Sequence, residues 1–300
     1  MATIPMDQRD GFIWYDGQLV PWREARLHVL SHGLHYASAV FEGERVYDGR
    51  VFELAAHGQR LLRSCAILDL DCPYGAAELD RAAEAVIAAN GIVDGYLRRI
   101  VWRGSEQLGV AARETSIRVA IAAWPWPSYF DPEATMRGLR LSIADWRRPD
   151  PMTAPVLAKA SCLYATGTLA KHKAERAGYD DALMLDWRGL VAEATGANVF
   201  FTHGEVLHTP VPEGFLDGIT RQAVIGLAKA RGIEVVERQI GLCELAEFEE
   251  CFVTGTAAEV TPVRTIGPFS FTPGALTRQL MVDFATLVRQ PVANPLQPAA

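Results

Sequence analysis

Lys159 is the residue of this sequence whose type is hardest to explain by surface charge alone. Only four of the 29 lysines and arginines are lysines, at positions 159, 171, 173 and 229. Arginine serves surface charge equally well, but its guanidinium does not lose a proton and attack a carbonyl carbon. Lys159 lies in the small and apolar stretch TAPVLAKASCLY, whereas the other three lie in polar stretches. We therefore predict a reactive amine; the alternative is a leftover surface residue.

A lysine that forms a Schiff base with pyridoxal phosphate needs several partners, and the sequence holds a candidate for each. The pyridine nitrogen needs a carboxylate to stay protonated, and Glu193 lies between apolar residues in VAEATGANVFF. The phenolic oxygen needs a donor, for which Tyr164 is the candidate shortly after Lys159. The phosphate needs an arginine and free backbone N–H groups, best at a helix start. The candidates for the phosphate are Arg60 and the stretches LDGITRQAV (216–224) and VTGTAAEVTP (253–262).

Other polar residues of the sequence point less clearly to chemistry. His28, His32 and His35 lie close together in HVLSHGLHY, but a glycine lies between them and no cysteine or acidic residue completes a ligand set. We expect them to make packing contacts and turn hydrogen bonds, with no metal bound. We expect His57 on a helix surface, and RRPDP (147–151) as a loop without a nucleic-acid role.

The composition fits a globular protein that binds neither nucleic acid nor a membrane. Three hundred residues, 49% of them hydrophobic, are long enough for two cores, and the net charge of −7 is not gathered in blocks. A basic stripe for nucleic acid and a run of about 18 apolar residues for a membrane span are both lacking. The N-terminal MATIPMDQRDGF has no apolar segment of a signal peptide. Five cysteines without a CxxC pair are typical of reduced thiols in a cytoplasmic protein without zinc.

The first half of the chain alternates between hairpins and helices. Asp-Gly pairs between apolar runs predict hairpins in WYDGQLV and VYDGRVF. Helices are expected over about 53–70 and 77–89, and the second of them ends at the Asn90-Gly91 pair. Two further strands are expected in GYLRRIVWRG and SIRVAIAAW.

The second half begins with the strand-like LRLSIADW and continues after Lys159 with a helix over about 160–177. Short strands joined by glycine turns are expected in DALMLDWRGLVAEATGANVFFTHGEVLHT. The remaining elements are an amphipathic helix in ITRQAVIGLAKARG, strands in IEVVERQI and CFVTG, and a last helix in GALTRQLMVDFATLVRQ.

A cluster of proline and aromatic residues, WPWPSYFDPEA (124–134), is the expected domain boundary. We predict an N-terminal α/β domain over residues 1–124, an interdomain linker over 125–137 and a C-terminal barrel-like α/β domain over 138–300. Hairpins predominate and no regular alternation of strand and helix occurs, so the expected fold class is α+β.

Together these stretches resemble the branched-chain amino acid aminotransferases, in the fold-type IV group of pyridoxal phosphate enzymes. The match covers nearly the whole chain, from GFIWYDGQLVPWREARLHVLSHGLHYASAVFEGERVY to TGTAAEVTPV. The motifs SHGLHY, FEG with a following arginine, AKA with LY, EATGANVFF, GITR and GTAAEVTPV occur in the family's order and at its approximate spacings. The resemblance implies a two-domain fold-type IV fold with the cofactor in the cleft between the domains.

The resemblance also implies roles for matching residues. Lys159 would be the catalytic residue and would hold pyridoxal 5'-phosphate as a Schiff base. Glu193 would face the pyridine nitrogen, and Tyr164 would bond the phenolic oxygen. Arg60 would bind the phosphate. The other implied cofactor-binding residues are Gly196, Asn198, Leu216, Gly218, Ile219, Thr220, Gly255 and Thr256.

For the substrate, the resemblance implies that Arg98 receives the distal carboxylate of glutamate and that Arg45 supports it. Backbone N–H groups of Thr256 and Ala257 would bind the substrate carboxylate. Tyr36 would reach across from a partner subunit. The side-chain pocket would be lined by Phe41, Tyr96, Trp126 and Tyr164.

Some residues leave the substrate range open. Neighbouring strand residues point to opposite faces, so only one of Arg98 and Arg99 can face the pocket, and we expect Arg99 to face water. Glu44 lies where many family members carry an aliphatic residue. ATGAN replaces a commoner GxGxN, and Cys162 closely follows the lysine. None of these departures removes a catalytic group.

The implied protein is a homo-oligomer, at least a dimer, that moves the amino group of leucine, isoleucine or valine to 2-oxoglutarate and forms glutamate by a ping-pong mechanism. D-amino acid aminotransferases, (R)-amine aminotransferases and aminodeoxychorismate lyases are alternatives on the same fold, although FEGERVY, Arg98 and GTAAE favour branched-chain substrates. A cofactor-free binding or scaffold protein is a further alternative. An absorbance band at about 400 nm from a lysine–pyridoxal Schiff base would exclude a cofactor-free protein.

Overall fold

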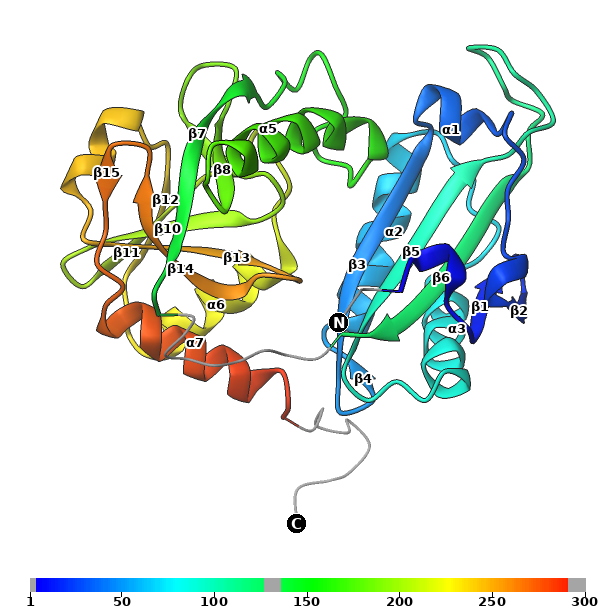
Figure 1. Ribbon diagram of the computed structural model, residues 1–300, viewed down its shortest axis with the longest axis horizontal. Helices are drawn as coiled ribbons and strands as arrows, with labels where there is room; N and C mark the ends of the chain where they lie inside the picture. The colour runs from blue at the N-terminus through cyan, green and yellow to red at the C-terminus, as the bar shows by residue number, and fades with distance from the viewer. Residues whose placement is uncertain (1–3, 127–135, 291–300) are drawn as a thin grey trace.

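The structure is a computed structural model that describes residues 4–126 and 136–290. Two β-sheets form, one of six strands from the first half of the chain and one of nine strands from the second half. The two sheets and their helices lie side by side (Figure 1). Most strand pairs are antiparallel, and helices pack on both sheets, as the predicted α+β class requires.

The first sheet has the strand order β2-β1-β6-β5-β3-β4 and is antiparallel throughout. Its strands are β1 (Phe12–Tyr15), β2 (Gln18–Pro21), β3 (Ala39–Tyr47), β4 (Arg50–Val51), β5 (Gly95–Arg103) and β6 (Ile117–Pro125). Its helices are α1 (His32–Tyr36), α2 (Leu54–Ile67) and α3 (Ala76–Ala89), with short 3₁₀ turns at Met6–Gln8 and Trp22–Glu24.

Both predicted Asp-Gly hairpins form. The turn between β1 and β2 places Asp16 at φ 45° and Gly17 at φ 99°. The turn between β3 and β4 places Asp48 at φ 51° and Gly49 at φ 76°. Positive φ at both central residues is the geometry of a type I′ turn, whose twist matches that of the flanking strands.

Helices α2 and α3 cover one face of the first sheet, and the opposite face carries the expected substrate residues. On β5, Leu97 and Val101 are fully buried in the apolar cluster beneath the two helices. Because side chains alternate along a strand, Tyr96 and Arg98 point to the opposite face. The strand register therefore places Arg98, and not Arg99, on the open face.

Arg99 does not face water, contrary to the expectation from the sequence. Its side chain is fully buried beneath the helices, where its Nε lies 2.8 Å from Glu44 Oε1 and its Nη1 lies 2.9 Å from Asp80 Oδ1. Glu44 is also fully buried. The unusual acidic residue in FEGERVY thus pairs with an arginine on the helix-covered face and does not enter the substrate side of the sheet.

The second sheet follows the order β12-β11-β10-β13-β14-β7-β8-β9, with β15 beside β14. A further pairing of β9 with β10, through Glu193 and Asn198, joins the ring β10-β13-β14-β7-β8-β9 into a closed barrel. Its strands are β7 (Leu139–Arg147), β8 (Asp181–Leu185), β9 (Val191–Ala194), β10 (Asn198–His203), β11 (Val206–Pro210), β12 (Val235–Arg238), β13 (Glu250–Gly255), β14 (Glu259–Ile266) and β15 (Phe269–Ser270).

The helices of the second half are α5 (Tyr164–Arg176), α6 (Ile219–Ala230) and α7 (Ala275–Leu287), with 3₁₀ turns at Ser161–Leu163 and Leu242–Glu247. The helix expected from residue 160 begins only at Tyr164, because a 3₁₀ turn precedes it. Lys159 therefore lies in an irregular segment outside the helix. Among the described helices, none combines the length and the apolar character that crossing a membrane requires.

Several contacts join the two halves. Val40 of β3 forms an isolated bridge with Ala160, and the Tyr47 hydroxyl donates to Glu259 over 2.7 Å. Strand β6 extends to Pro125, the first residue of the predicted linker. Most of that linker, with Tyr129 and Phe130 of the aromatic cluster, lies outside the described residues.

We expect Arg99→Ala to lower the free energy of unfolding by about 3–5 kcal/mol, because the buried carboxylate of Glu44 loses its partner. Equilibrium urea denaturation measures this loss. Arg118→Ala is the matched control: Arg118 pairs with Asp16 and Glu106, but its side chain is 41% exposed, and we expect a loss of about 1 kcal/mol or less. Similar losses in the two variants would contradict the buried ion pair.

Candidate active site

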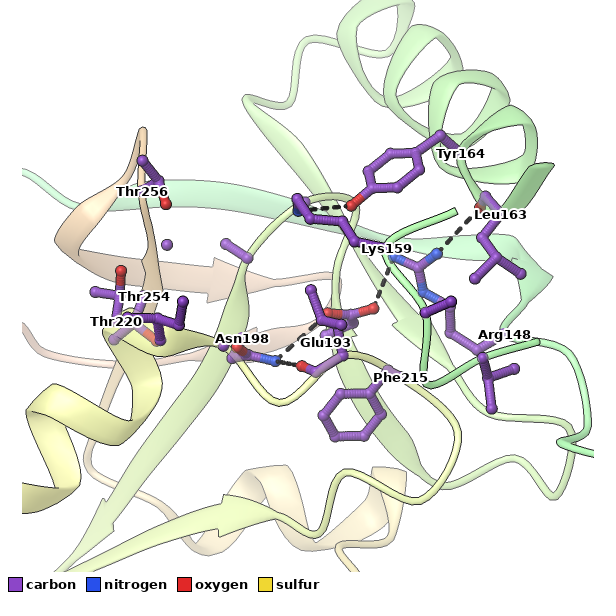
Figure 2. A pocket seen from close by; sticks show the side chains of 18 of the residues that line it. Arg148, Lys159, Leu163, Tyr164, Glu193, Asn198, Phe215, Thr220, Thr254 and Thr256 are labelled. Carbon is purple, nitrogen blue, oxygen red and sulfur yellow. Dashed lines mark hydrogen bonds and ion pairs between the residues drawn. The ribbon is translucent and has the colours of Figure 1, made fainter. Parts of the chain in front are cut away.

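Lys159 points into a cavity between the two halves of the chain, and its backbone is held from both sides. Its N–H donates to Ser64 Oγ of α2 over 3.0 Å, and its carbonyl oxygen accepts from Phe41 N over 3.1 Å. Its amine lies 2.9 Å from the hydroxyl of Tyr164, the first residue of α5 (Figure 2). The side chain reaches the cavity from a segment with little freedom to move away.

Glu193 lies on the same cavity, on barrel strand β9, and is buried. Its carboxylate lies 2.8 Å from Arg148 Nη2 and accepts from Asn198 Nδ2 over 3.4 Å. Burial raises the pKa of Glu193, and the charges of Arg148 and Lys159 partly oppose this. A protonated pyridine nitrogen next to this carboxylate would be a further cation and would stabilise its ionised form. The ionised carboxylate would in turn keep the pyridine nitrogen protonated.

Arg148 is the main site residue that sequence reasoning missed. Of RRPDP, Arg147 is the last residue of β7, and residues 148–151 form the expected loop. The Arg148 side chain turns inward there and is 6% exposed. Besides Glu193, it donates to the carbonyl oxygens of Leu163 (3.3 Å) and Thr195 (3.2 Å). In Figure 2 it approaches Glu193 from the side opposite Thr220 and Thr256. Two adjacent arginines in a sequence carry no signal that one of them is buried.

Arg60 reaches the cavity from α2 and is fixed by a buried acid. Its Nε and Nη2 each donate to the Glu42 carboxylate over 2.7 Å, and Glu42 also bonds His57 Nδ1 over 2.7 Å. Burial by itself raises the pKa of Glu42, but the hydrogen bonds and charges of Arg60 and His57 outweigh it and lower the pKa to about 2. His57 is 2% exposed. The expectation of a helix-surface histidine was wrong, because α2 turns this face toward the sheet.

The start of α6 and the end of β13 supply backbone groups to the cavity. Gly218 caps α6, whose first N–H groups are a ready site for an anion. Asn198 Nδ2 donates to the carbonyl of Leu216 over 3.0 Å and fixes this loop. A Cβ at Gly218 would lie 2.2 Å from Asn198 Oδ1, so the close approach requires glycine. Thr254 Oγ1 is buried with no hydrogen-bond partner among the described residues and faces the same space.

The cavity lining contains every residue that the resemblance assigned to the cofactor: Arg60, Lys159, Tyr164, Glu193, Gly196, Asn198, Leu216, Gly218, Ile219, Thr220, Gly255 and Thr256. Its chemistry fits pyridoxal phosphate from end to end. In the protein, a buried carboxylate suits the cofactor's ring nitrogen, an amine suits its aldehyde, and a tyrosine hydroxyl suits its phenolic oxygen. An arginine and a helix start suit the phosphate.

The expected substrate residues lie beside this cavity on the open face of the first sheet. The Arg98 guanidinium lies 4.6 Å from the Phe41 ring centre and 5.6 Å from that of Tyr96. Its Nε is buried with no hydrogen-bond partner in the described part of the chain. The Trp126 ring lies 5.5 Å from Tyr96. A Cβ at Gly43 would lie 2.0 Å from the Tyr96 hydroxyl, so this glycine makes room for the aromatic pocket.

The other expected substrate residues are Arg45, Ala257 and Tyr36, and none of them lines this cavity. Arg45 Nη2 lies 3.7 Å from Glu259, two residues beyond Ala257, and stacks its guanidinium over Tyr47. Ala257 is exposed next to the cavity residue Thr256. Tyr36 is 47% exposed on α1 and does not line the cavity of its own chain.

The histidines near Tyr36 make the hydrogen bonds that their positions in the sequence suggested. His32 bonds Ser38 Oγ over 2.6 Å and the carbonyl of Gly109 over 2.7 Å, and His35 bonds the carbonyl of Val29 over 2.9 Å. Within residues 4–126 and 136–290, no three His, Cys, Asp or Glu side chains gather as a metal site would need.

Comparison with known proteins places this site in a family. The model of the class IV amino-transferases matches residues 39–266. A probable branched-chain-amino-acid aminotransferase of Rickettsia felis is 39% identical over 97% of this chain and 100% of its own length. The branched-chain amino acid aminotransferase of T.th. with pyridoxamine 5'-phosphate is 37% identical, with a TM-score of 0.91, over 94% of this chain and 96% of that one. The same enzyme complexed with N-(5'-phosphopyridoxyl)-L-glutamate is 36% identical, with a TM-score of 0.89 over the same shares of the two chains.

The chain belongs to the class IV aminotransferases. The family resemblance seen in the sequence and the fold-type IV architecture are both confirmed. For a class IV aminotransferase, the cofactor is pyridoxal phosphate, and the cavity around Lys159 has the groups to hold it.

The cavity of this class IV aminotransferase also includes residues that the sequence did not single out. They are mostly small or apolar and carry no functional signal of their own, and only their place in the fold reveals them. They are Arg148, Pro149, Val156, Ala158, Leu163, Ala197, Gly214, Phe215 and Thr254.

We expect Arg148→Gln to lower kcat by about tenfold at neutral pH, because Glu193 loses the cation that opposes the rise in its pKa. A carboxyl group with a higher pKa ionises at higher pH, so the acidic limb of the kcat profile should move to higher pH. The variant should approach the wild-type rate above that limb. Arg147→Gln, at the exposed neighbouring arginine, should leave the profile unchanged. A uniform loss at all pH values would show a structural role for Arg148 only.

Proposed function

We propose that this chain transfers the amino group of leucine, isoleucine or valine to 2-oxoglutarate and forms glutamate. One arrangement supports this most: an amine, a phenol and a buried carboxylate share a cavity beside an aromatic pocket. The Arg98 guanidinium lies in that pocket, and its buried Nε has no partner among the described residues. The relatives and solved structures at 36–39% identity are named as branched-chain aminotransferases, one of them in complex with a phosphopyridoxyl derivative of glutamate.

We assign each residue of the cavity a separate role in the reaction. When bound, pyridoxal phosphate supplies an electron sink that allows the substrate's α-proton to leave. Lys159 would hold the cofactor in the resting enzyme, and its amine would take and return the substrate's α-proton as general base and acid. Glu193 holds the proton at the ring nitrogen by charge, and Arg60 with the start of α6 holds the phosphate. The Tyr164 hydroxyl, which lies 2.9 Å from the lysine amine, would also hydrogen-bond the phenolic oxygen of the cofactor.

Two substrates of different polarity must use the same pocket, because a ping-pong reaction binds them in turn. The rings of Phe41, Tyr96 and Trp126 suit a branched apolar side chain. A γ-carboxylate among these rings would be costly to bury without a partner. Arg98 has a buried Nε without a partner among the described residues and faces this pocket, so it is suited to receive that carboxylate.

We also propose that the enzyme is a cytoplasmic homo-oligomer, at least a dimer. Large apolar side chains near Tyr36 are exposed, Leu34 by 63% and Val110 by 89%, as a subunit contact would require. Five free cysteines support a reducing compartment. The two separate sheets support a division into domains at residues 1–124 and 138–300 with the cofactor between them, and a linker over 125–137.

A panel of L- and D-amino acids with 2-oxoglutarate tests the proposed activity, together with an absorbance spectrum of the purified enzyme. We expect an absorbance band at about 400 nm and glutamate formation with L-leucine, L-isoleucine and L-valine. Turnover of D-amino acids or (R)-amines in their place would assign another activity of the same fold. A protein without the band would contradict every enzymatic assignment.

We expect Lys159→Ala to remove the absorbance band and to lower kcat by several orders of magnitude, because the nucleophile and the base are lost together. The fold should persist, as circular dichroism would show, because the Lys159 backbone contacts to Ser64 and Phe41 remain. A variant that keeps as much as about a tenth of the wild-type rate would refute the assignment.

We expect Arg98→Ala to raise KM for glutamate and 2-oxoglutarate by about tenfold or more, since a hydrogen bond to a charged group contributes about 1.5–3 kcal/mol. KM for leucine should change by less than about threefold, because that side chain makes no ionic contact. Steady-state kinetics with each substrate provides the comparison, and leucine is the internal control. Equal losses with glutamate and leucine would show a defect of folding or cofactor binding.

A further inference from the structure

The hairpin loop between β13 and β14 ends in a residue with an unusual backbone conformation. Gly255 and Glu259 form the pair that closes this hairpin, and residues 256–258 form its turn. Glu259 has φ 51°, in the left-handed region. Short hairpin loops often need this conformation, but glycine usually supplies it, because a side chain makes it unfavourable. A glutamate that keeps this conformation must be held there by its surroundings.

The first half of the chain holds the Glu259 side chain. The Tyr47 hydroxyl, at the end of β3, donates to Glu259 Oε1 over 2.7 Å, and Arg45 Nη2 lies 3.7 Å from the same oxygen. The guanidinium carbon of Arg45 lies 5.1 Å from the Tyr47 ring centre. Arg45 and Tyr47 are two residues apart on one strand, so they point to the same face of the first sheet as Tyr96, the strand partner of Arg45. Glu259 is thus bound across the junction of the two halves.

Tyr47 is a rigid partner in this contact. It is 2% exposed and belongs to an apolar cluster with Phe252 of β13 and Val260 of β14, the strands on either side of the loop. Burial and the charge of Glu259 raise the pKa of Tyr47, so its hydroxyl stays protonated and can donate. The hydroxyl therefore has a fixed position relative to both strands, and it fixes the Glu259 carboxylate in turn.

The loop that ends at Glu259 carries the backbone groups expected to bind the substrate carboxylate. Thr256 lines the cavity of Lys159, and Ala257 is exposed beside it. Neither Thr256 N nor Ala257 N donates a hydrogen bond to another described residue. Free N–H groups of successive residues in a turn form a site for an anion. The conformation of this turn therefore decides where an anion is bound.

We propose that Glu259 is a positioning residue for the α-carboxylate of the substrate. It acts through the turn and not by contact with the substrate. Its carboxylate is held by Tyr47 and Arg45. The left-handed conformation that results aims the N–H groups of Thr256 and Ala257 at the cavity. The inference rests on the proposed function, because it requires an amino acid whose α-carboxylate binds this turn. It adds that the first half of the chain sets the carboxylate site of the second half.

Glu259→Gly separates the side chain from the backbone, because glycine adopts the left-handed conformation freely and only the carboxylate is lost. The probe is 4-methylpentanoate, which is leucine without its amino group, and calorimetry with the holoenzyme gives its dissociation constant. We expect Glu259→Gly to weaken binding by about tenfold or more, because the turn is no longer held in one conformation. KM for leucine and for glutamate should rise alike, since both carry an α-carboxylate, whereas kcat should change by less than about threefold.

Tyr47→Phe removes the donor and keeps the ring, and we expect it to weaken binding of the probe by about threefold or more. The double variant should bind within about twofold of Glu259→Gly alone, because the two residues act through one contact. Arg289→Ala is the matched control. Arg289 lies 5.6 Å from the Tyr47 ring centre and pairs with Asp48 and Asp94, but no hydrogen bond or ion pair joins it to Glu259 in the described part of the chain. Its loss should change the dissociation constant by less than about twofold.

Two results would overturn the inference. One is a Glu259→Gly enzyme that binds the probe within about twofold of the wild type, because glycine would then be sufficient for the turn. The other is an equal loss in Tyr47→Phe and Arg289→Ala, because any contact between the halves would then have the same effect. A wild-type protein that neither turns over leucine nor binds the probe would overturn the proposed function itself. The two failures are distinguishable, because the second appears without any variant.

Discussion

The buried carboxylate of Glu193 is the constraint on which this site depends. It lies at the pairing of β9 with β10 that closes the barrel, so the fold has no freedom to move it toward water. Burial alone favours its neutral form, and Arg148 and Lys159 oppose that preference. A charge held in this way is suited to stabilise a protonated ring nitrogen. The same closure places Asn198, which fixes the loop before α6.

Helix α2 connects the chemistry to the rest of the first half. Its inner face carries Arg60, which Glu42 and His57 orient, and Ser64, which accepts a hydrogen bond from the Lys159 backbone. One rigid element therefore sets both the phosphate end and the amine end of the cavity.

The first sheet separates two kinds of charge by the alternation of strand side chains. One face of β3 and β5 carries Glu42, Glu44 and Arg99 beneath the helices, where each is paired. The other carries Arg98 beside aromatic rings, with a buried nitrogen that no described residue bonds. The paired charges hold the sheet and α2 together. The face without helices is therefore the one that presents Arg98 to a ligand.

Local rules and motifs in the sequence by itself determined the hairpins at Asp16-Gly17 and Asp48-Gly49, most helix bounds, the family, and the residues expected to gather around Lys159. They could not show the position of Arg148 or His57, or the partner of Arg99, because burial depends on residues far apart in the chain. RRPDP is predicted as a loop and residues 148–151 do form one, but only the closed barrel turns Arg148 toward Glu193. The start of α5 at Tyr164 likewise depends on a 3₁₀ turn after the segment that β3 and α2 hold at Lys159. Tertiary packing decided these features because it sets which polar side chains lose water and must find a partner.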